Sequence, residues 1–348
     1  MRRLLAVLVA GLPLLAPLLA VPTAASAAAE EPERWATEVF ARVPSPGYPA
    51  YVHKHTNGRV YAGTYVNSQA TGVPSRVFEW TGDGTLLRSW PMPGQVRDGE
   101  HGVQVAHQTR SGRLVLLETS KPRVLTLDVR TGRFRTLARF PDGAVPNYAT
   151  WGPGGALYVT DYAAGVIWRV GRDREPERWF TSPALEGVLG LGTTGIGFRR
   201  GSRDLLITQQ TTTATPTRGH LSSLPVNADG SPGELRTLWT SAPGDLPDGF
   251  GIGRSGRIYV AMAGLSAQLV ELSADGEELG RFPETPLTGD NGSPIPFDTA
   301  CSATFHGTRV LVANQSAVLG DASHQAILAV EVGERGRAAY LPRPAWVR

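Results

Sequence analysis

The 348-residue chain fits either two ordinary domains or one large all-β domain. It contains 41 Gly and 27 Pro but only 19% charged residues, which indicates many turns and few long helices. With 34 basic and 31 acidic side chains, its net charge of +3 is too small to indicate a nucleic-acid partner.

The first 27 residues have the pattern of a secretory signal peptide. Arg2 and Arg3 precede an apolar run, and Ala25-Ser26-Ala27 supplies small residues for cleavage. An uncleaved membrane anchor is the alternative, but two prolines interrupt the run. Removing residues 1–27 takes away two Arg and no acid, so the mature net charge is 3 − 2 = +1. We therefore expect a secreted protein, cleaved near Ala27, with no membrane attachment after cleavage.

One sequence pattern recurs six times along the rest of the chain. A polar or small residue leads an apolar run, and a Gly-rich turn joins it to a second run rich in β-branched residues. These second runs lie at 58–64, 112–118, 155–161, 203–209, 256–262 and 308–314. Third and fourth apolar runs follow in most repeats, as at 75–80 and 85–90.

Four antiparallel strands recurring about every 50 residues are typical of propeller blades, which bury both faces against their neighbours. The sequence predicts one all-β domain over residues 28–348, a six-bladed β-propeller of four-stranded antiparallel blades. The blades are expected to begin near residues 44, 99, 144, 189, 246 and 294. Either residues 28–43 or residues 335–348 should close the ring by donating an edge strand.

The first strand of each propeller blade lines a central channel, so the residues that lead these strands should meet there. These expected channel residues are Ala50, His101, Asn147, Thr194, Asp248 and Cys301. Their mixed polarity favours a ligand site, although each residue taken alone could serve only as a turn former. Glu118 and Asp161 end second strands near the expected channel mouth, where they could join the site or cap turns.

Two of these blades resemble the senescence-marker-protein/gluconolactonase family. The resemblance rests on Leu246–Ile252 (LPDGFGI) with the following GRIYVA, and on Pro146–Trp151 (PNYATW) with the following GALYVTD. It implies a divalent cation, usually calcium or zinc and here expected to be calcium, held on the channel axis by a Glu, two Asn and an Asp. Asp248 and Asn147 match two of these positions.

Two positions depart from the family pattern. Thr194 stands where the second Asn is expected, and Ala50 stands where the Glu is expected. The missing Glu removes half of the formal ligand charge, and charge count tunes calcium affinity. The metal set implied by the resemblance is therefore Asn147, Asp248 and Thr194.

A second, shorter segment, Glu100-His101-Gly102-Val103, resembles part of the paraoxonase lactonases, in which a histidine lies beside the catalytic metal. The two resemblances together imply hydrolysis of a lactone or carboxylic ester. Asp248 is the first expected general base and His101 the second. The alternative is a non-catalytic secreted propeller that binds a small molecule, a carbohydrate or a protein. We expect a monomer.

Overall fold

All regular structure in the described residues is β-strand or short 3-10 turn. The computed structural model describes residues 33–45, 47–66, 72–317 and 320–343. This part of the chain contains 24 strands and no α-helix. The four 3-10 turns are η2 (Pro153–Gly155), η3 (Pro183–Leu185), η4 (Val188–Gly190) and η5 (Ala322–His324). The predicted all-β class is confirmed.

The strands form six four-stranded antiparallel blades. Blade 1 contains β2 (Tyr48–Lys54), β3 (Val60–Val66), β4 (Arg76–Trp80) and β5 (Leu86–Pro91). Blade 2 contains β6 (His101–Gln108), β7 (Leu114–Glu118), β8 (Arg123–Asp128) and β9 (Arg133–Arg139). Blade 3 contains β10 (Pro146–Trp151), β11 (Leu157–Asp161), β12 (Val166–Val170) and β13 (Pro176–Thr181).

The remaining blades follow the same meander. Blade 4 contains β14 (Thr193–Arg199), β15 (Asp204–Gln209), β16 (His220–Pro225) and β17 (Arg236–Thr240). Blade 5 contains β18 (Pro247–Ile252), β19 (Ile258–Met262), β20 (Leu269–Leu272) and β21 (Glu278–Phe282). Blade 6 contains β22 (Ala300–His306), β23 (Arg309–Asn314), β24 (Ala326–Glu331) and β1 (Thr37–Arg42).

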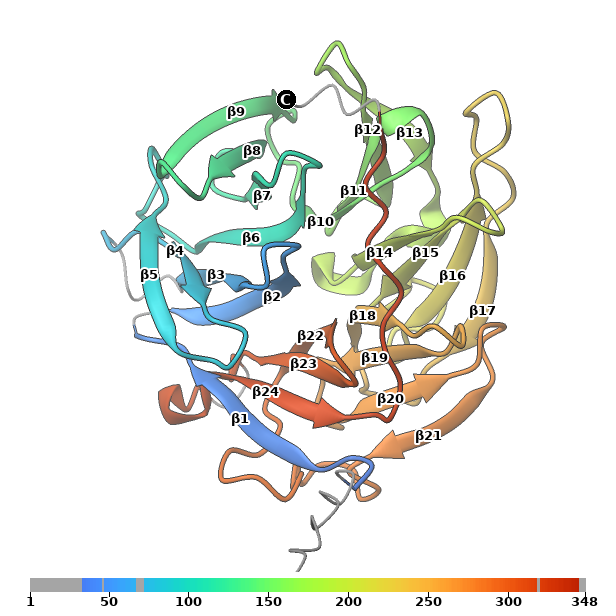
Figure 1. The fold of residues 1–348 in the computed structure, drawn as a ribbon. Helices are drawn as coiled ribbons and strands as arrows, with labels where there is room; N and C mark the ends of the chain where they lie inside the picture. The colour runs from blue at the N-terminus through green and yellow to red at the C-terminus, as the bar shows by residue number, and fades with distance from the viewer. Residues whose placement is uncertain (1–32, 46, 67–71, 318–319, 344–348) are drawn as a thin grey trace, which may run out of the picture. The chain divides into compact units, whose positions relative to one another are not determined.

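The first strands of the blades surround a common axis (Figure 1). They contact one another in ring order, from β2 through β6, β10, β14 and β18 to β22, which returns to β2. Blades 1 and 2 are also joined by a short ladder between β3 and β6. The ring brings together residues that are far apart in the sequence, as in the hydrogen bond from the Val52 backbone amide to the Ser302 hydroxyl, 250 positions away.

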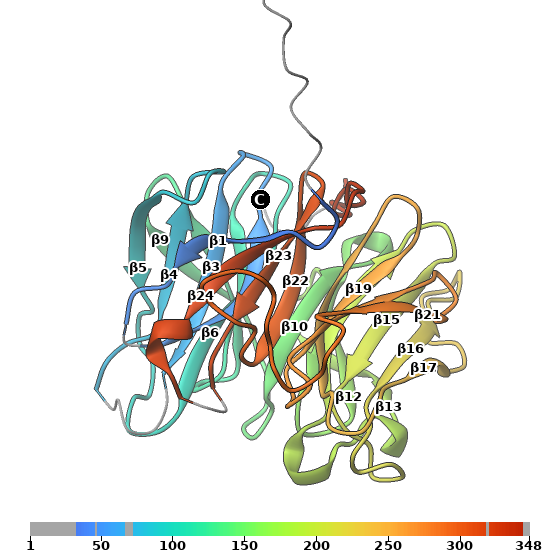
Figure 2. The same ribbon diagram turned by 90° about the horizontal axis from the view of Figure 1, so that it is seen from below.

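The N-terminal segment closes the ring. β1 pairs antiparallel with β24, the third strand of blade 6, and the two lie side by side in both views (Figures 1 and 2). Of the two closing segments that the sequence left open, the structure therefore selects the one within residues 28–43. Closure covers an edge of β24 that would otherwise present unpaired backbone groups.

The C-terminal segment follows a different path, crossing one end of the blades (Figure 1). The Arg337 amide donates to the Ile252 carbonyl of blade 5 at 2.8 Å. The Tyr340 ring lies 5.1 Å from the Phe198 ring of blade 4. The Leu341 carbonyl accepts from the side chain of Arg110 in blade 2 at 3.2 Å. This segment ties non-adjacent blades together at the carboxyl ends of the first strands.

Burial explains the continuous apolar runs in the sequence. The second strands β7, β11 and β19 are buried along their whole length, because a neighbouring blade covers each face. Outer strands such as β5 are mostly exposed or half-buried. Gly58, Gly112 and Gly256 supply the positive φ angles of 86°, 84° and 100° in the turns between first and second strands. The rigid inner layer fixes where the channel residues point.

Candidate functional site in the channel

Five of the expected channel residues occupy the same position in their blades. Near the start of the first strand, its pairing with the second strand shifts register, as between Pro49 and Val52 in blade 1. Blades 3 to 6 show the same shift. A bulge of this kind re-aims the side chains it contains. The residues at these shifts include Ala50, Asn147, Thr194, Asp248 and Cys301.

His101 does not take this position in blade 2. It lies at the first residue of β6 and pairs with Val66 of blade 1. Its Nδ1 is 2.7 Å from the Gly99 carbonyl oxygen, and its Nε2 is 2.7 Å from the Val73 carbonyl oxygen. Backbone carbonyl oxygens thus lie within hydrogen-bonding distance of both ring nitrogens, and His101 is held by the backbone rather than directed into the channel. The repeat misplaced this residue because it took the residue that leads each first strand, and β6 begins three residues before Gln104, which holds the shared position.

Gln104 stands three residues later, at the position that the repeat alignment gave to His101. The preceding residue, Val103, faces Glu118 at the end of the second strand, as Pro146 faces Asp161 in blade 3. Gln104 is buried, and its Nε2 donates to the Tyr65 hydroxyl at 2.7 Å. Only the register between β6 and β7 shows that Gln104 holds the shared position of the repeat.

Asp248 lies at the centre of a buried polar cluster that we call the channel cluster: Tyr51, Asn147, Gln210 and Asp248. The Tyr51 hydroxyl donates to Asp248 Oδ1 and lies 3.3 Å from Asn147 Oδ1. Gln210 Nε2 donates to Asp248 Oδ2 at 3.3 Å. Asp248 is 8% exposed and Asn147 is 9% exposed, so the cluster is nearly closed to solvent. Four different blades supply its members.

Aromatic rings support the channel cluster. The Tyr148 ring stacks on the Tyr51 ring, with centroids 4.0 Å apart. The Tyr162 hydroxyl donates to Gln210 Oε1 at 2.6 Å and so orients that carboxamide toward Asp248. The sequence repeat missed Tyr51, although Tyr51 and Tyr148 each follow a channel residue directly. For Gln210, in the loop after β15, no sequence signal was available.

Burial dominates the electrostatics of the cluster. It raises the pKa of Asp248 to about 7, against the hydrogen bonds from Tyr51 and Gln210, which lower the pKa. Burial, followed by the charge of Asp248, raises the pKa of the Tyr51 phenol well above its usual range. The same two causes raise the pKa of the Cys301 thiol, so Cys301 stays a neutral thiol.

The other expected site residues are held by structural contacts. Thr194 Oγ1 donates to the Pro247 carbonyl at 3.0 Å and lies 3.2 Å from the Thr208 hydroxyl. Ala50 is 1% exposed and brings only a methyl group. Glu118 pairs with Arg123 at 3.0 Å.

Asp161 satisfies backbone groups at the end of β11. Its Oδ1 accepts from the amides of Val145, Ala163 and Ala164 at 3.2 to 3.3 Å, and its Oδ2 accepts from Trp168 Nε1 at 2.9 Å. These contacts match the turn-capping alternative for this residue.

The residues around Asp248 do not fit the cation implied by the family resemblance. Among the described residues, no group of three or more His, Cys, Asp or Glu side chains is placed to hold a metal ion. Ala50 supplies no oxygen, and the Thr194 hydroxyl already donates to a carbonyl. The Tyr51 hydroxyl contacts both Asn147 and Asp248 and occupies the space between their oxygens. Calcium needs about six to eight oxygens, and one carboxylate and one carboxamide fall short of that number.

Calcium is accordingly expected to leave the thermal stability of the protein unchanged. Addition of 1 mM Ca²⁺ or of EDTA should shift Tm by less than about 1 °C, because a ligand stabilises only if it binds the folded state. The double variant Ala50→Glu/Tyr51→Phe restores the missing carboxylate and removes the competing hydroxyl, so it should gain a calcium-dependent rise in Tm. A calcium-dependent rise of several degrees in the wild type would show that the native residues do hold the cation.

Three histidines cluster farther along the first strands, beyond Tyr51. The His53 ring lies 6.1 Å from the His55 ring and 5.8 Å from the His107 ring. Burial lowers the pKa of His107 to about 4. Burial, followed by the neighbouring histidines, lowers the pKa of His53 well below its usual range. The cluster is therefore uncharged at neutral pH.

His107 is expected to make folding stability fall between pH 6.5 and about 4. The unfolded chain takes up a proton near pH 6.5, whereas folded His107 does so only near pH 4. Acidification through this window therefore favours unfolding, by about 2 kcal/mol between pH 6.5 and 5. Urea unfolding at pH 7 and pH 5 should show a smaller drop in His107→Gln than in the control His220→Gln, whose ring is half-buried. Equal drops in the two variants would refute this linkage.

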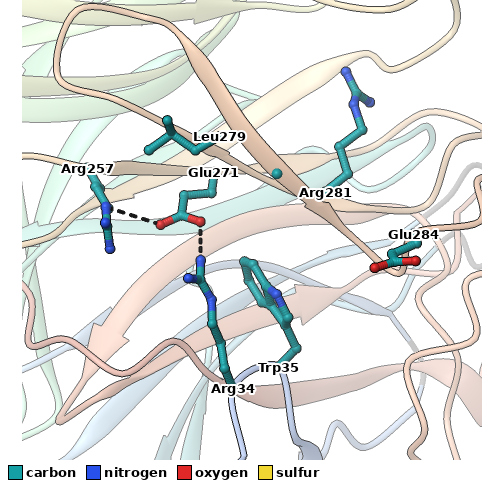
Figure 3. Close-up of a pocket in the computed structure, with 8 residues that line it drawn as sticks. Arg34, Trp35, Arg257, Glu271, Leu279, Arg281 and Glu284 are labelled. Carbon is teal, nitrogen blue, oxygen red and sulfur yellow. Dashed lines mark hydrogen bonds and ion pairs between the residues drawn. The ribbon is translucent and has the colours of Figure 1, made fainter.

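A separate cavity of about 570 Å³ lies outside the channel, against blade 5 and the segment before β1 (Figure 3). Its walls carry both charges and one tryptophan, and are formed by Arg34, Trp35, Arg257, Glu271, Leu279, Gly280, Arg281 and Glu284. None of these residues was singled out in the sequence.

No helix of the described residues has the length and apolar character needed to cross a membrane.

Fold and channel cluster together define the class of protein: a six-bladed β-propeller with a polar site in its channel. No protein-family model matches the sequence, and a search of curated proteins found no match. Similar solved structures include regucalcin from Agrobacterium tumefaciens, a calcium-binding protein, with 16% identity and a TM-score of 0.64 over 88% of this chain and 99% of that chain.

Two further solved structures carry enzyme names. Luciferin-regenerating enzyme shares 15% identity, with a TM-score of 0.62 over 88% of this chain and 98% of that chain. A gluconolactonase from Xanthomonas campestris shares 16% identity, with a TM-score of 0.53 over 84% and 98%. The predicted resemblance to the gluconolactonase family is thus confirmed at the level of the fold.

Proposed function

We propose that the protein is a secreted, monomeric propeller that hydrolyses a small lactone or carboxylic ester at the channel cluster, with Asp248 as general base. The main supporting observation is the environment of Asp248: its carboxylate is buried, with 8% of the residue exposed, and accepts from Gln210 and from the Tyr51 hydroxyl that also contacts Asn147. Secretion is supported by the pattern of residues 1–27, and lactone chemistry by the name of the similar gluconolactonase.

The reaction uses only groups of this chain. Asp248 Oδ2 accepts a proton from water as the water oxygen attacks the carbonyl carbon. The Gln210 carboxamide donates to this carboxylate, and the Asn147 carboxamide accepts from the Tyr51 hydroxyl beside it. In this mechanism their amide groups donate to the oxyanion as it develops. The tetrahedral intermediate then expels the ring alkoxide, which takes the proton from Asp248. The product is a hydroxy acid.

Tyr51 positions the base in this proposal. Its hydroxyl donates to Asp248 Oδ1, and Gln210 donates to Oδ2, whose second lone pair accepts the proton. The stacked Tyr148 ring fixes Tyr51 in place. This is a positioning role, because the phenol contacts the carboxylate rather than the reacting carbonyl.

A second candidate is a non-catalytic propeller that binds a small molecule at the same site. The Tyr51 hydroxyl favours this candidate because it fills the space between Asn147 and Asp248. A catalytic water and a substrate carbonyl would both need access to that space. A hydroxyl-bearing ligand could replace the phenol and hydrogen-bond to both residues.

One experiment separates the two candidates. Residues 28–348 are mixed with a panel of five- and six-membered lactones and simple esters, and acid release is followed by pH-stat. Asp248-dependent release on at least one compound supports the hydrolase. If no compound is hydrolysed faster by the wild type than by Asp248→Asn, the hydrolase proposal fails. Calorimetry with the same compounds and their hydroxy acids then tests binding without turnover.

A further inference from the structure

One of the residues that line the cavity against blade 5 is a glycine. Gly280 of β21 stands directly opposite Glu271 of β20 in the antiparallel ladder. A Cβ atom built on Gly280 would meet no atom within 4 Å, so the missing side chain leaves open space. A larger residue here would project over Glu271. Gly280 therefore keeps the Glu271 side of the cavity open.

Glu271 holds two arginines at the cavity wall. Its side chain is only 3% exposed, and its Oε2 pairs with Arg34. Its Oε1 lies 3.4 Å from Arg257 Nε and also accepts from the Tyr259 hydroxyl at 3.1 Å. One buried carboxylate thus orients two guanidinium groups that are each nearly half exposed, with 46% and 45% of their side-chain surfaces accessible. Figure 3 shows both arginines directed at Glu271.

Among the described residues, each of the two guanidinium groups pairs with Glu271 through one of its nitrogens, and its other nitrogens remain as hydrogen-bond donors for a ligand. Within the described part of the chain, Arg34 NH2 and Arg257 Nε are the guanidinium nitrogens through which these two residues form their ion pairs. Both arginines thus face Glu271 at this wall. A second carboxylate, Glu334, contacts the Tyr259 hydroxyl that also contacts Glu271. Arg281 adds no further free charge, because Asp245 and Glu278 pair with it. Glu284 lines the cavity at a distance from the arginine pair in Figure 3.

Aromatic packing holds the site in shape. The Trp35 ring stacks on Phe282 with centroids 5.3 Å apart and planes 4° apart. The Arg34 guanidinium lies over the Trp35 ring, 4.7 Å from its centroid. Contacts of this kind restrict the rotamers of a long side chain, so less entropy is lost when a ligand binds.

We infer that this cavity is a second ligand site, distinct from the channel cluster, which binds a small organic anion through Arg34 and Arg257. A carboxylate or phosphate group matches the planar donor fork of a guanidinium and forms charge-assisted hydrogen bonds with it. The cavity volume of about 570 Å³ leaves room for the organic part of the ligand beside Gly280. This inference is independent of the proposed hydrolase activity.

Calorimetric titration of residues 28–348 with gluconate, and separately with inorganic phosphate, tests the site. Saturable binding with a dissociation constant on the order of 1 mM is expected, and it should weaken as NaCl is raised. Arg257→Gln should weaken binding about 10-fold, because it removes one charged donor group. Gly280→Leu should weaken it by a similar factor while leaving every charge in place. Binding of both probes indicates recognition of the anionic group alone, whereas selective binding of gluconate assigns the organic part a role.

Two control variants test whether the loss of binding is specific to this cavity. Arg236→Gln removes an exposed arginine of blade 4 that pairs with Glu234, and it should bind like the wild type. Asp248→Asn should also bind like the wild type, which separates this site from the channel. No saturable binding up to about 50 mM of either probe, or equal affinities in Gly280→Leu and Arg236→Gln, would overturn the inference.

Discussion

Asp248→Asn is expected to lower kcat/KM for lactone or ester hydrolysis by about 10²- to 10⁴-fold, the usual contribution of a general base. Asparagine keeps the shape of the side chain but cannot accept a proton from water. Because only ionised Asp248 acts as base, wild-type kcat/KM should rise as pH rises through about 7. The measurement is initial-rate kinetics by pH-stat or chromogenic ester assay between pH 5.5 and 8.5.

Folding of this variant provides an internal check. Asparagine carries no charge that must be desolvated, so Tm should be equal to or higher than that of the wild type. Asp275→Asn, in an exposed turn of blade 5, is the matched control and should leave kcat/KM unchanged. Loss of activity together with a large fall in Tm, or unchanged activity with intact folding, would reject the assignment of Asp248 as base.

Removal of the closing strand is expected to have the largest effect on stability. A chain that begins at residue 43 lacks β1 and exposes the edge of β24, which loses five register pairs. It also loses Trp35 and the buried Ala41. Burial of one or two large apolar side chains and an edge strand corresponds to about 5 kcal/mol. Urea unfolding should show this loss, and light scattering should show association through the exposed edge.

The matched control is a chain that begins at residue 33 and therefore keeps β1. It should unfold like the chain that begins at residue 28. A synthetic peptide of residues 33–45, added to the chain that lacks β1, should restore most of the stability, because its pairing partners on β24 remain in place. A truncated chain that stays monomeric with an unchanged unfolding midpoint would show that β1 does not close the ring.

The channel cluster shows where sequence reasoning succeeded and where it stopped. Asp248 and Asn147 were named from their place in the repeat, and the structure joins them through the Tyr51 hydroxyl. His101 was placed as the residue that leads its first strand, but it lies three residues before Gln104, which holds the shared position in that blade. Strand register is set by pairing with a distant segment, and a single sequence does not display it.

The sequence by itself determined the repeat and hence the architecture. The spacing of apolar runs and turn glycines depends on local preferences and on a two-residue alternation, both of which are written along the chain. Tertiary structure alone decided the contacts between blades: the phenol of Tyr51 between Asn147 and Asp248, the choice of β1 as closing strand, and the arginine pair held by Glu271. Most of these contacts join residues about 100 to 300 positions apart. Ring closure creates them, and no local pattern records them.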